Sequence, residues 1–313
     1  MSLCFSVLLA KCRIIFDIAE RNSDSMLLVA FRQEIFRTVE PISSTRPRGV
    51  TVIQSVDRAI RILLALQGAR RLSLSDLAAQ LGLPNSTVHG ILQTLASQGM
   101  VEQEPGSLRY MLGPAVLRLS SVYLDNLEFR SRTLKWSEEL ARRSGLSVRA
   151  GVLLLGDVII VHHEPRPDGS RQMPEVGFVM PAHASALGKA LLAFRPEEAT
   201  QLLMVSRLRS MTGETIVDPQ ALRDDLEQVS RTGIATEHDE ALLGESSLAA
   251  PVFDATALAV GAVGVVIPSS EWPPPDSLHD DLREAARNIS RELGSPGWPV
   301  YIEPEHRQAA AQA

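Results

Sequence analysis

The chain has 313 residues, of which 45% are apolar and 22% charged, and its formal net charge is −6. This length allows two hydrophobic cores, so we expect two domains. No run of eighteen apolar residues occurs, which excludes a transmembrane helix, and the absence of cysteine beyond Cys12 suits a reducing compartment. We therefore expect a cytoplasmic protein without a membrane partner.

Residues 1–49 are predicted to be an N-terminal extension outside the fold. The segment ends in a stretch rich in proline, serine and glycine over residues 41–49, which is typical of a linker. We expect this extension to be disordered. Arg46 and Arg48 within it are candidates for a flexible arm on DNA, or for an ordinary solvated linker.

Three short helices and a hairpin are predicted over residues 50–113. The first helix repeats apolar residues at helical spacing, the second begins with a capping box from Ser73 to Asp76, and a turn at residues 82–84 precedes the third. A hairpin follows over residues 101–112. The faces predicted to be buried are Val56, Ala59, Ile60 and Leu63 in the first helix, and Val88, Ile91, Leu92 and Leu95 in the third.

From residue 114 the pattern changes to a linker helix, predicted over 114–130, and then a larger domain over 131–293. Strand-like segments in this domain come in pairs with helices between the pairs, which favours an antiparallel sheet flanked by helices. The predicted fold class is therefore α+β: an N-terminal winged helix-turn-helix, a linker helix and a C-terminal α/β sensor domain of GAF-like type. Residues 294–313 are predicted to be a disordered tail.

The helix-turn-helix followed by a hairpin predicts binding to double-stranded DNA. In this arrangement the third helix enters the major groove and the hairpin lies beside it. Residues 1–113 contain 12 Lys or Arg and 9 Asp or Glu, whereas the rest of the chain is acidic. A packing module capped by Ser86 and Thr87 is the alternative interpretation. The candidate DNA-binding residues are Asn85, Ser86, Thr87, His89 and Gln93 in the helix, and Ser107 and Arg109 in the hairpin.

Three collinear segments resemble the IclR family of bacterial transcriptional regulators. They are residues 54–63 with 72–89 (QSVDRAIRIL, LSLSDLA and GLPNSTVH), 181–193 (PAHASALGKALLA) and 240–252, and the similarity covers about residues 53–293. The resemblance implies a ligand-responsive regulator, which we expect to be a repressor. It also implies homodimers, often paired into tetramers. We expect a symmetric dimer on an inverted-repeat operator, because one winged helix buries little surface.

Two residues of the third helix depart from the family. Asn85 stands where a Lys or Arg is common, and Gly90 stands where an Arg is common. Both changes remove a phosphate contact, and Gly90 also lowers helix stability by about 1 kcal/mol relative to Ala.

The resemblance also implies an effector site in the C-terminal domain. Its candidate residues are Ser185, Ala186, Leu187, Glu237, Ser247, Gly264 and Val266. The backbone amides of Ala186 and Leu187 open a helix and favour a carboxylate. Gly264 and Val266 replace two serines of family members that sense small oxo- or hydroxy-acids, so the sequence favours a larger or more apolar acid, such as an aromatic one. The alternative is that both are plain core positions.

A metal-binding or enzymatic protein is the competing interpretation. His162, His163, Glu164, His183, His238, Asp239 and Glu240 are residue types that bind zinc or iron. However, His162 and His163 are adjacent in a strand and point to opposite faces. The sequence contains no phosphate-binding loop, metalloprotease histidine pair or nucleophile elbow. We therefore expect no catalytic residue, metal or cofactor, and we expect Lys189 to pair with a nearby carboxylate.

Overall fold

The computed structural model of the protein describes residues 52–170, 172–204 and 208–298. The predicted extension over residues 1–49, with Arg46 and Arg48, lies outside the described residues, as does the part of the predicted 294–313 tail from residue 299 onward. Residues 294–298 of that tail are described, and the Trp298 indole N–H donates to the Pro251 carbonyl at 2.7 Å. The chain divides into two compact units, with the boundary between Tyr123 and Leu124. Within the described ranges, no helix is long and apolar enough to cross a membrane.

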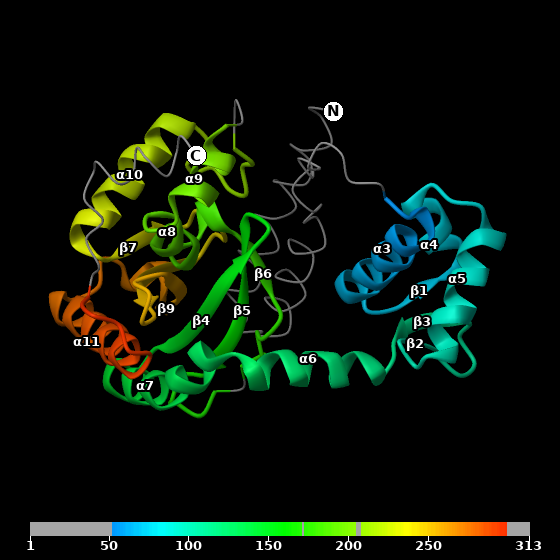
Figure 1. The fold of residues 1–313 in the computed structure, drawn as a ribbon, viewed down its shortest axis with the longest axis horizontal. Helices are drawn as coiled ribbons and strands as arrows, with labels where there is room; N and C mark the ends of the chain where they lie inside the picture. Colours follow the sequence, from blue (N-terminus) through cyan, green and yellow to red (C-terminus); the bar gives the residue numbers. More distant parts are fainter. Residues whose placement is uncertain (1–51, 171, 205–207, 299–313) are drawn as a thin grey trace. The chain divides into compact units, whose positions relative to one another are not determined.

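The first unit is a winged helix-turn-helix (Figure 1). Its helices are α3 (Gln54–Ala69), α4 (Leu74–Leu81) and α5 (Asn85–Ser97). Strands β1 (Leu72–Ser73), β2 (Val101–Gln103) and β3 (Arg109–Leu112) form an antiparallel sheet in the order β1-β3-β2. Helix α6 (Ala115–Asn126) follows, and the boundary between the two units falls within it.

Local sequence signals explain how α4 begins and ends. The Ser73 hydroxyl accepts a hydrogen bond from the Asp76 N–H, and the Asp76 carboxylate accepts one from the Ser73 N–H, which is the predicted capping box. Gly82 ends the helix with φ +64°, in the left-handed region that glycine adopts without steric cost. The turn at Gly82 sets the direction in which α5 leaves α4.

The buried face of α3 differs from the prediction. Val56 and Ile60 were expected in the core, but they are 52% and 50% exposed. Ile62 and Leu66 are the buried residues of this helix, and Leu63 packs against their cluster as expected. The sequence pattern was ambiguous because α3 carries apolar residues on two faces, and both follow the helical period.

The second unit is a six-stranded antiparallel sheet with helices on both faces. The strand order is β6-β5-β4-β9-β8-β7. The strands are β4 (Ser147–Leu154), β5 (Asp157–Glu164), β6 (Val179–Pro181), β7 (Ala235–His238), β8 (Glu245–Phe253) and β9 (Ala259–Pro268). This architecture confirms the predicted α+β fold, with a winged helix-turn-helix followed by an antiparallel sheet flanked by helices.

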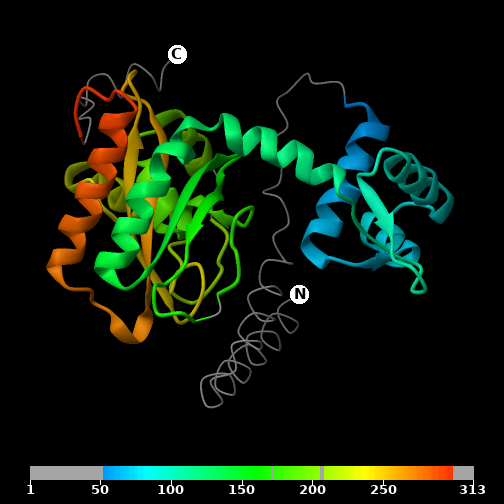
Figure 2. The same ribbon diagram turned by 90° about the horizontal axis from the view of Figure 1, so that it is seen from below.

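Helices α7 (Glu128–Ser144) and α11 (Asp276–Glu292) lie side by side on one face of this sheet (Figure 2). Strand residues Val148, Ala150, Leu248, Val263 and Val265 share a hydrophobic core with these helices. Because successive side chains of a strand alternate between faces, the residues between them point to the opposite face.

That opposite face carries η1 (Ala182–Ala184) and α8 (Ala186–Leu192), with α9 (Pro196–Leu203) and α10 (Pro219–Thr232) beyond them. The turn η2 (Ser269–Glu271) follows β9. In the sheet register Arg149 pairs with Gly264, which pairs with Ala249, and Ser247 pairs with Val266. These positions face α8, and all of them except Ala249 line the site described next.

Candidate DNA interface and effector pocket

The exposed face of α5 carries the predicted DNA-binding side chains. Asn85, Ser86, His89 and Gln93 are exposed and Thr87 is half-buried, whereas Val88 and Leu92 on the opposite side are fully buried. Pro84 is the N-cap of α5, and no side chain caps the helix start. Ser86 and Thr87 therefore do not act as the capping residues of the alternative interpretation. The Thr87 and Val88 N–H groups donate to the Pro84 carbonyl, and the start of α5 is the positive end of the helix dipole.

The hairpin tip carries a second set of polar side chains. Ser107 donates a hydrogen bond to the Glu104 carboxylate, and Glu104 also pairs with Arg71 at 2.6 Å. Ser107 and Arg109 are exposed, as predicted for residues that contact DNA. Leu108, which was not among the predicted residues, is 74% exposed and has φ +53° at the tip.

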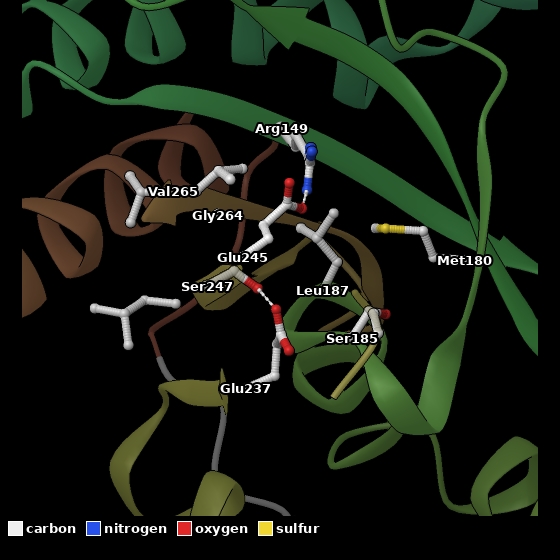
Figure 3. Close-up of a pocket in the computed structure, with 12 residues that line it drawn as sticks. Arg149, Met180, Ser185, Leu187, Glu237, Glu245, Ser247, Gly264 and Val265 are labelled. Carbon is white, nitrogen blue, oxygen red and sulfur yellow. Dashed lines mark hydrogen bonds and ion pairs between the residues drawn. The ribbon is translucent and has the colours of Figure 1, made fainter. Parts of the chain in front are cut away.

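A pocket lies between the start of α8 and the sheet (Figure 3). The space between its lining residues is about 310 Å³ and opens to solvent. All the predicted effector residues except Ala186 line it. The lining residues are Arg149, Met180, Ser185, Leu187, Glu237, Ala241, Glu245, Ser247, Leu248, Gly264, Val265 and Val266.

Arg149 is the positively charged residue in the pocket lining, and it was not among the predicted site residues. Its guanidinium holds Glu175 through two nitrogens, Nε and Nη2, the second at 2.9 Å from Oε1. The third nitrogen, Nη1, donates to Glu245. Arg149 and Glu175 are both buried, so the pair is shielded from water. The positive charge of this arginine is therefore already balanced by two carboxylates.

Glu237 and Ser247, predicted separately, contact each other. The Ser247 hydroxyl donates to Glu237 Oε1 at 3.0 Å, and the Glu240 N–H donates to Oε2 at the same distance. Burial raises the pKa of Glu237 to about 7, although these hydrogen bonds act to lower it. A carboxyl group that is only partly ionised near neutral pH thus lies in the pocket wall.

Lys189 lies behind the pocket and pairs with carboxylates, as predicted. Its side chain is 1% exposed, and Nζ lies 2.6 Å from Glu240 Oε1 and 3.0 Å from Asp225 Oδ2. It also donates to the Thr236 carbonyl. The lysine therefore links α8 to α10 through Asp225, and to β7 and the segment after it through Thr236 and Glu240.

Two glycines mark close backbone contacts. A Cβ at Gly188 would lie 2.1 Å from the Ala182 carbonyl oxygen, which explains how α8 packs tightly on η1. A Cβ at Gly264 would lie 2.6 Å from the Leu248 carbonyl oxygen. The predicted gap beside Gly264 is therefore filled by the neighbouring strand, and the position offers no room for a larger ligand.

Two residues at the start of α8 differ from the predicted effector contacts. Ala186 is fully buried and does not line the pocket, whereas Leu187 does. Ser185 is the N-cap, and its hydroxyl accepts the Gly188 N–H at 3.2 Å. One of the helix-start donors is thus already used within the protein.

The histidines and carboxylates of the competing interpretation do not converge. His162 is buried, and burial lowers its pKa to about 4, while His183 Nε2 lies 2.8 Å from the Arg209 carbonyl oxygen. Within the described ranges, no group of three or more His, Cys, Asp or Glu side chains could hold a metal ion.

Both units of the chain match models of known protein families. The family model for the IclR helix-turn-helix domain matches residues 55–105, and the model for the bacterial transcriptional regulator IclR C-terminal domain matches residues 121–291. The glycerol operon regulatory protein of Streptomyces coelicolor is 43% identical over 248 residues, covering 78% of this chain and 97% of that protein.

Two more distant relatives give the same result. The transcriptional repressor IclR of Escherichia coli is 32% identical, covering 69% of this chain and 83% of that protein. The crystal structure of an IclR-type regulator from Silicibacter superposes with a TM-score of 0.68 at 28% identity, covering 78% of this chain and 98% of the other.

Proposed function

Because this chain belongs to the IclR family of bacterial transcriptional regulators, we propose that it is a repressor that binds an inverted-repeat operator as a symmetric dimer and responds to a small effector in the pocket beside α8. DNA binding, a ligand-binding C-terminal domain and regulation of transcription are properties of the family. The repressor role is supported by the relative from Escherichia coli, and with DNA as its partner we expect the protein to act in the cytoplasm.

The exposed polar face of α5 is the observation that carries the proposal. Gln93 and His89 project from the side of the helix opposite its buried residues, and the uncapped helix start beside Asn85 suits a phosphate. Ser107 and Arg109 extend this surface from the hairpin. We assign these residues to DNA, with Gln93 as the reader of a base edge.

Exposed apolar side chains in the first unit support a dimer. Val56, Ile60 and Leu64 follow the helical period along α3, with exposed Ile53 at its N-cap, and α6 has no buried residue. Its exposed apolar side chains are Leu117, Leu119, Val122 and Tyr123. Such surfaces are unfavourable in water, and a second copy of the chain is the partner that a two-fold symmetric operator requires.

The target genes are proposed from the relatives. Two relatives from Streptomyces coelicolor and Streptomyces griseus, 43% and 44% identical to this chain, are glycerol operon regulatory proteins. We propose that this chain controls genes for the use of glycerol or a similar small molecule.

The test is binding of the full chain to the DNA upstream of its own gene and of neighbouring operons. We expect a two-fold symmetric footprint, and affinity that falls steeply with salt. Gln93→Ala should cost about 1–3 kcal/mol at one base position per half-site, whereas Gln98→Ala, at the far end of α5, should not change base preference. Affinity for all DNA sequences alike, without a symmetric footprint, would contradict the proposal.

A further inference from the structure

We propose that the pocket beside α8 takes a neutral molecule with several hydroxyl groups, a small polyol, and discriminates against carboxylates and phosphates. The inference deepens the proposed function and rests on it, because it assumes that this pocket is the effector site. The sequence alone favoured an aromatic or other organic acid. The charges and the space in the pocket lead to a different class of molecule.

The charge balance of the pocket disfavours an anion. Arg149 is the only cationic residue among the described residues that line it, and both sides of its guanidinium are occupied by Glu175 and Glu245. Glu237 adds a third carboxyl group. An anionic effector could reach the guanidinium only by displacing Glu245 or Glu175, which would break the ion pair of that carboxylate with Arg149. An anion elsewhere in the pocket would face like charge.

Hydroxyl groups fit the polar atoms that remain. The Glu245 carboxylate can accept an O–H from a bound molecule, and the Glu237 carboxyl, whose pKa is about 7, can accept an O–H or, when protonated, donate one. The hydroxyls of Ser185 and Ser247 reach the same space and already accept or donate one hydrogen bond within the protein. Leu187, Met180 and Val266 supply aliphatic contacts for C–H groups, and Figure 3 shows Leu187 and Met180 on the side of the pocket opposite Ser247.

The size of the pocket favours a small molecule. The space of about 310 Å³ between its lining residues includes open solvent, so the enclosed part of the pocket is much smaller than this volume. Gly264 does not enlarge it, because the Leu248 carbonyl occupies the place of the missing side chain. A polyol of a few carbon atoms suits this space and these polar groups.

Isothermal titration of the full chain with three matched probes tests the inference. Glycerol is the neutral triol, glycerate replaces one alcohol by a carboxylate, and glycerol 3-phosphate adds a phosphate. We expect glycerol to bind at millimolar concentration or below, and both anions to bind on the order of tenfold more weakly, since like charges in a shielded site repel. Tighter binding of either anion, or no binding of glycerol at millimolar concentration, would overturn the inference.

A variant that removes one negative charge tests whether the carboxylates of the pocket cause this selectivity against anions. Glu245→Gln keeps the shape of the side chain but leaves Arg149 with one counter-charge fewer. The ratio of glycerate to glycerol affinity should rise about tenfold in this variant. Glu197→Gln, at an exposed position of α9 away from the pocket lining, should leave the ratio unchanged. An equal ratio in Glu245→Gln and parent would show that charge does not set selectivity.

Measurements of DNA binding distinguish failure of the proposed function from failure of the proposed effector class. If the parent chain binds no upstream DNA, the proposed function fails whatever the pocket takes. If it binds symmetric DNA and that binding responds to glycerate or glycerol 3-phosphate but not to glycerol, the function stands and only the polyol assignment fails.

Discussion

Glu237 combines deep burial with a titration near neutral pH. A free glutamate has a pKa of 4.5, and burial raises the pKa of Glu237 to about 7. Between these values the folded protein binds more protons than the unfolded chain, so its free energy of unfolding falls as the pH rises from 4.5 to 7. The loss attributable to this carboxyl is at most about 3 kcal/mol.

Glu237→Gln should remove this loss, because the amide cannot ionise and can still bond to Ser247 and to the Glu240 N–H. In denaturant titrations at pH 5 and pH 8, the variant should gain stability relative to the parent at pH 8. Asp157, whose pKa burial raises to about 6, and His162 titrate in both proteins and cancel in the difference. The exposed variant Glu197→Gln should follow the parent, and a pH-independent difference for Glu237→Gln would show that its carboxyl titrates normally.

The sequence identified individual pocket residues but not the group that controls their charge. Glu237, Ser247 and Leu187 were selected through a family resemblance, and they do line one pocket. Arg149 is the only charged residue of strand β4, and a lone charge in a mostly apolar strand is a signal for a buried charge. Its partners could not be predicted, because Glu175 lies 26 residues and Glu245 96 residues away in the chain.

Helix α5 contains a glycine on its exposed face that no packing requires. A Cβ at Gly90 would meet nothing within 4 Å. Gly90→Ala should stabilise the first unit by up to about 1 kcal/mol through helix propensity alone. Gly90→Arg should add a phosphate contact, strengthen binding to all DNA sequences and steepen the salt dependence by about one unit.

The two substitutions at Gly90 are matched controls for each other. Thermal unfolding measures the shared effect on helix stability, and DNA titrations at several salt concentrations measure the effect of charge. If Gly90→Arg changes DNA affinity no more than Gly90→Ala does, this face of α5 does not lie against the phosphate backbone.

Helix α3 illustrates why an amphipathic pattern alone gave the wrong buried face. Its residues Val56, Ile60 and Leu64 form an apolar stripe as regular as the one that is buried at Ile62 and Leu66. Periodicity identifies both stripes but not which one packs within the chain. The second stripe is explained if another copy of the protein covers it.

Ile60→Glu tests this explanation. A carboxylate in an apolar dimer interface is strongly destabilising, so we expect a shift from dimer to monomer in sedimentation experiments and weaker binding to a full operator. Gln80→Glu, on the exposed side of α4, introduces the same charge and should leave the dimer intact. A dimer of unchanged stability in Ile60→Glu would place the interface elsewhere.

At the scale of the whole molecule, the two units have separate hydrophobic cores. The core of the first unit consists of Ile62, Leu66, Leu77, Ala78, Val88, Leu92 and Val101, and that of the second is built on β4, β8, β9, α7 and α11. We therefore expect two transitions in calorimetry. Leu92→Ala should cost the first unit about 2–5 kcal/mol, and bound glycerol should raise only the transition of the second.

Calorimetry distinguishes separate unfolding of the two units from unfolding in one step. A single transition that shifts with both Leu92→Ala and glycerol would mean that the units unfold together. Leu92→Ala should lower one transition and leave the midpoint of the other unchanged, so the transition that moves identifies the first unit.

The class of fold was predictable because it depends on local patterns, whereas the sheet order was not. Capping residues, turns and alternating strands gave the winged helix-turn-helix and the paired strands. The central pairing of β4 with β9 joins segments about a hundred residues apart. Nothing local in either strand specifies that partner, and this pairing brings Arg149 next to Gly264.

The close approach at Gly264 restricts how ligand preference can diversify. Any larger side chain at this position meets the Leu248 carbonyl oxygen, so its cost falls on the sheet itself and not on a particular ligand. Changes in the shape of the pocket are therefore easier at Met180, Leu187 and Val266, which also line it, than at residue 264. A library intended to retrain this regulator for a different inducer should vary those three positions and keep residue 264 as glycine.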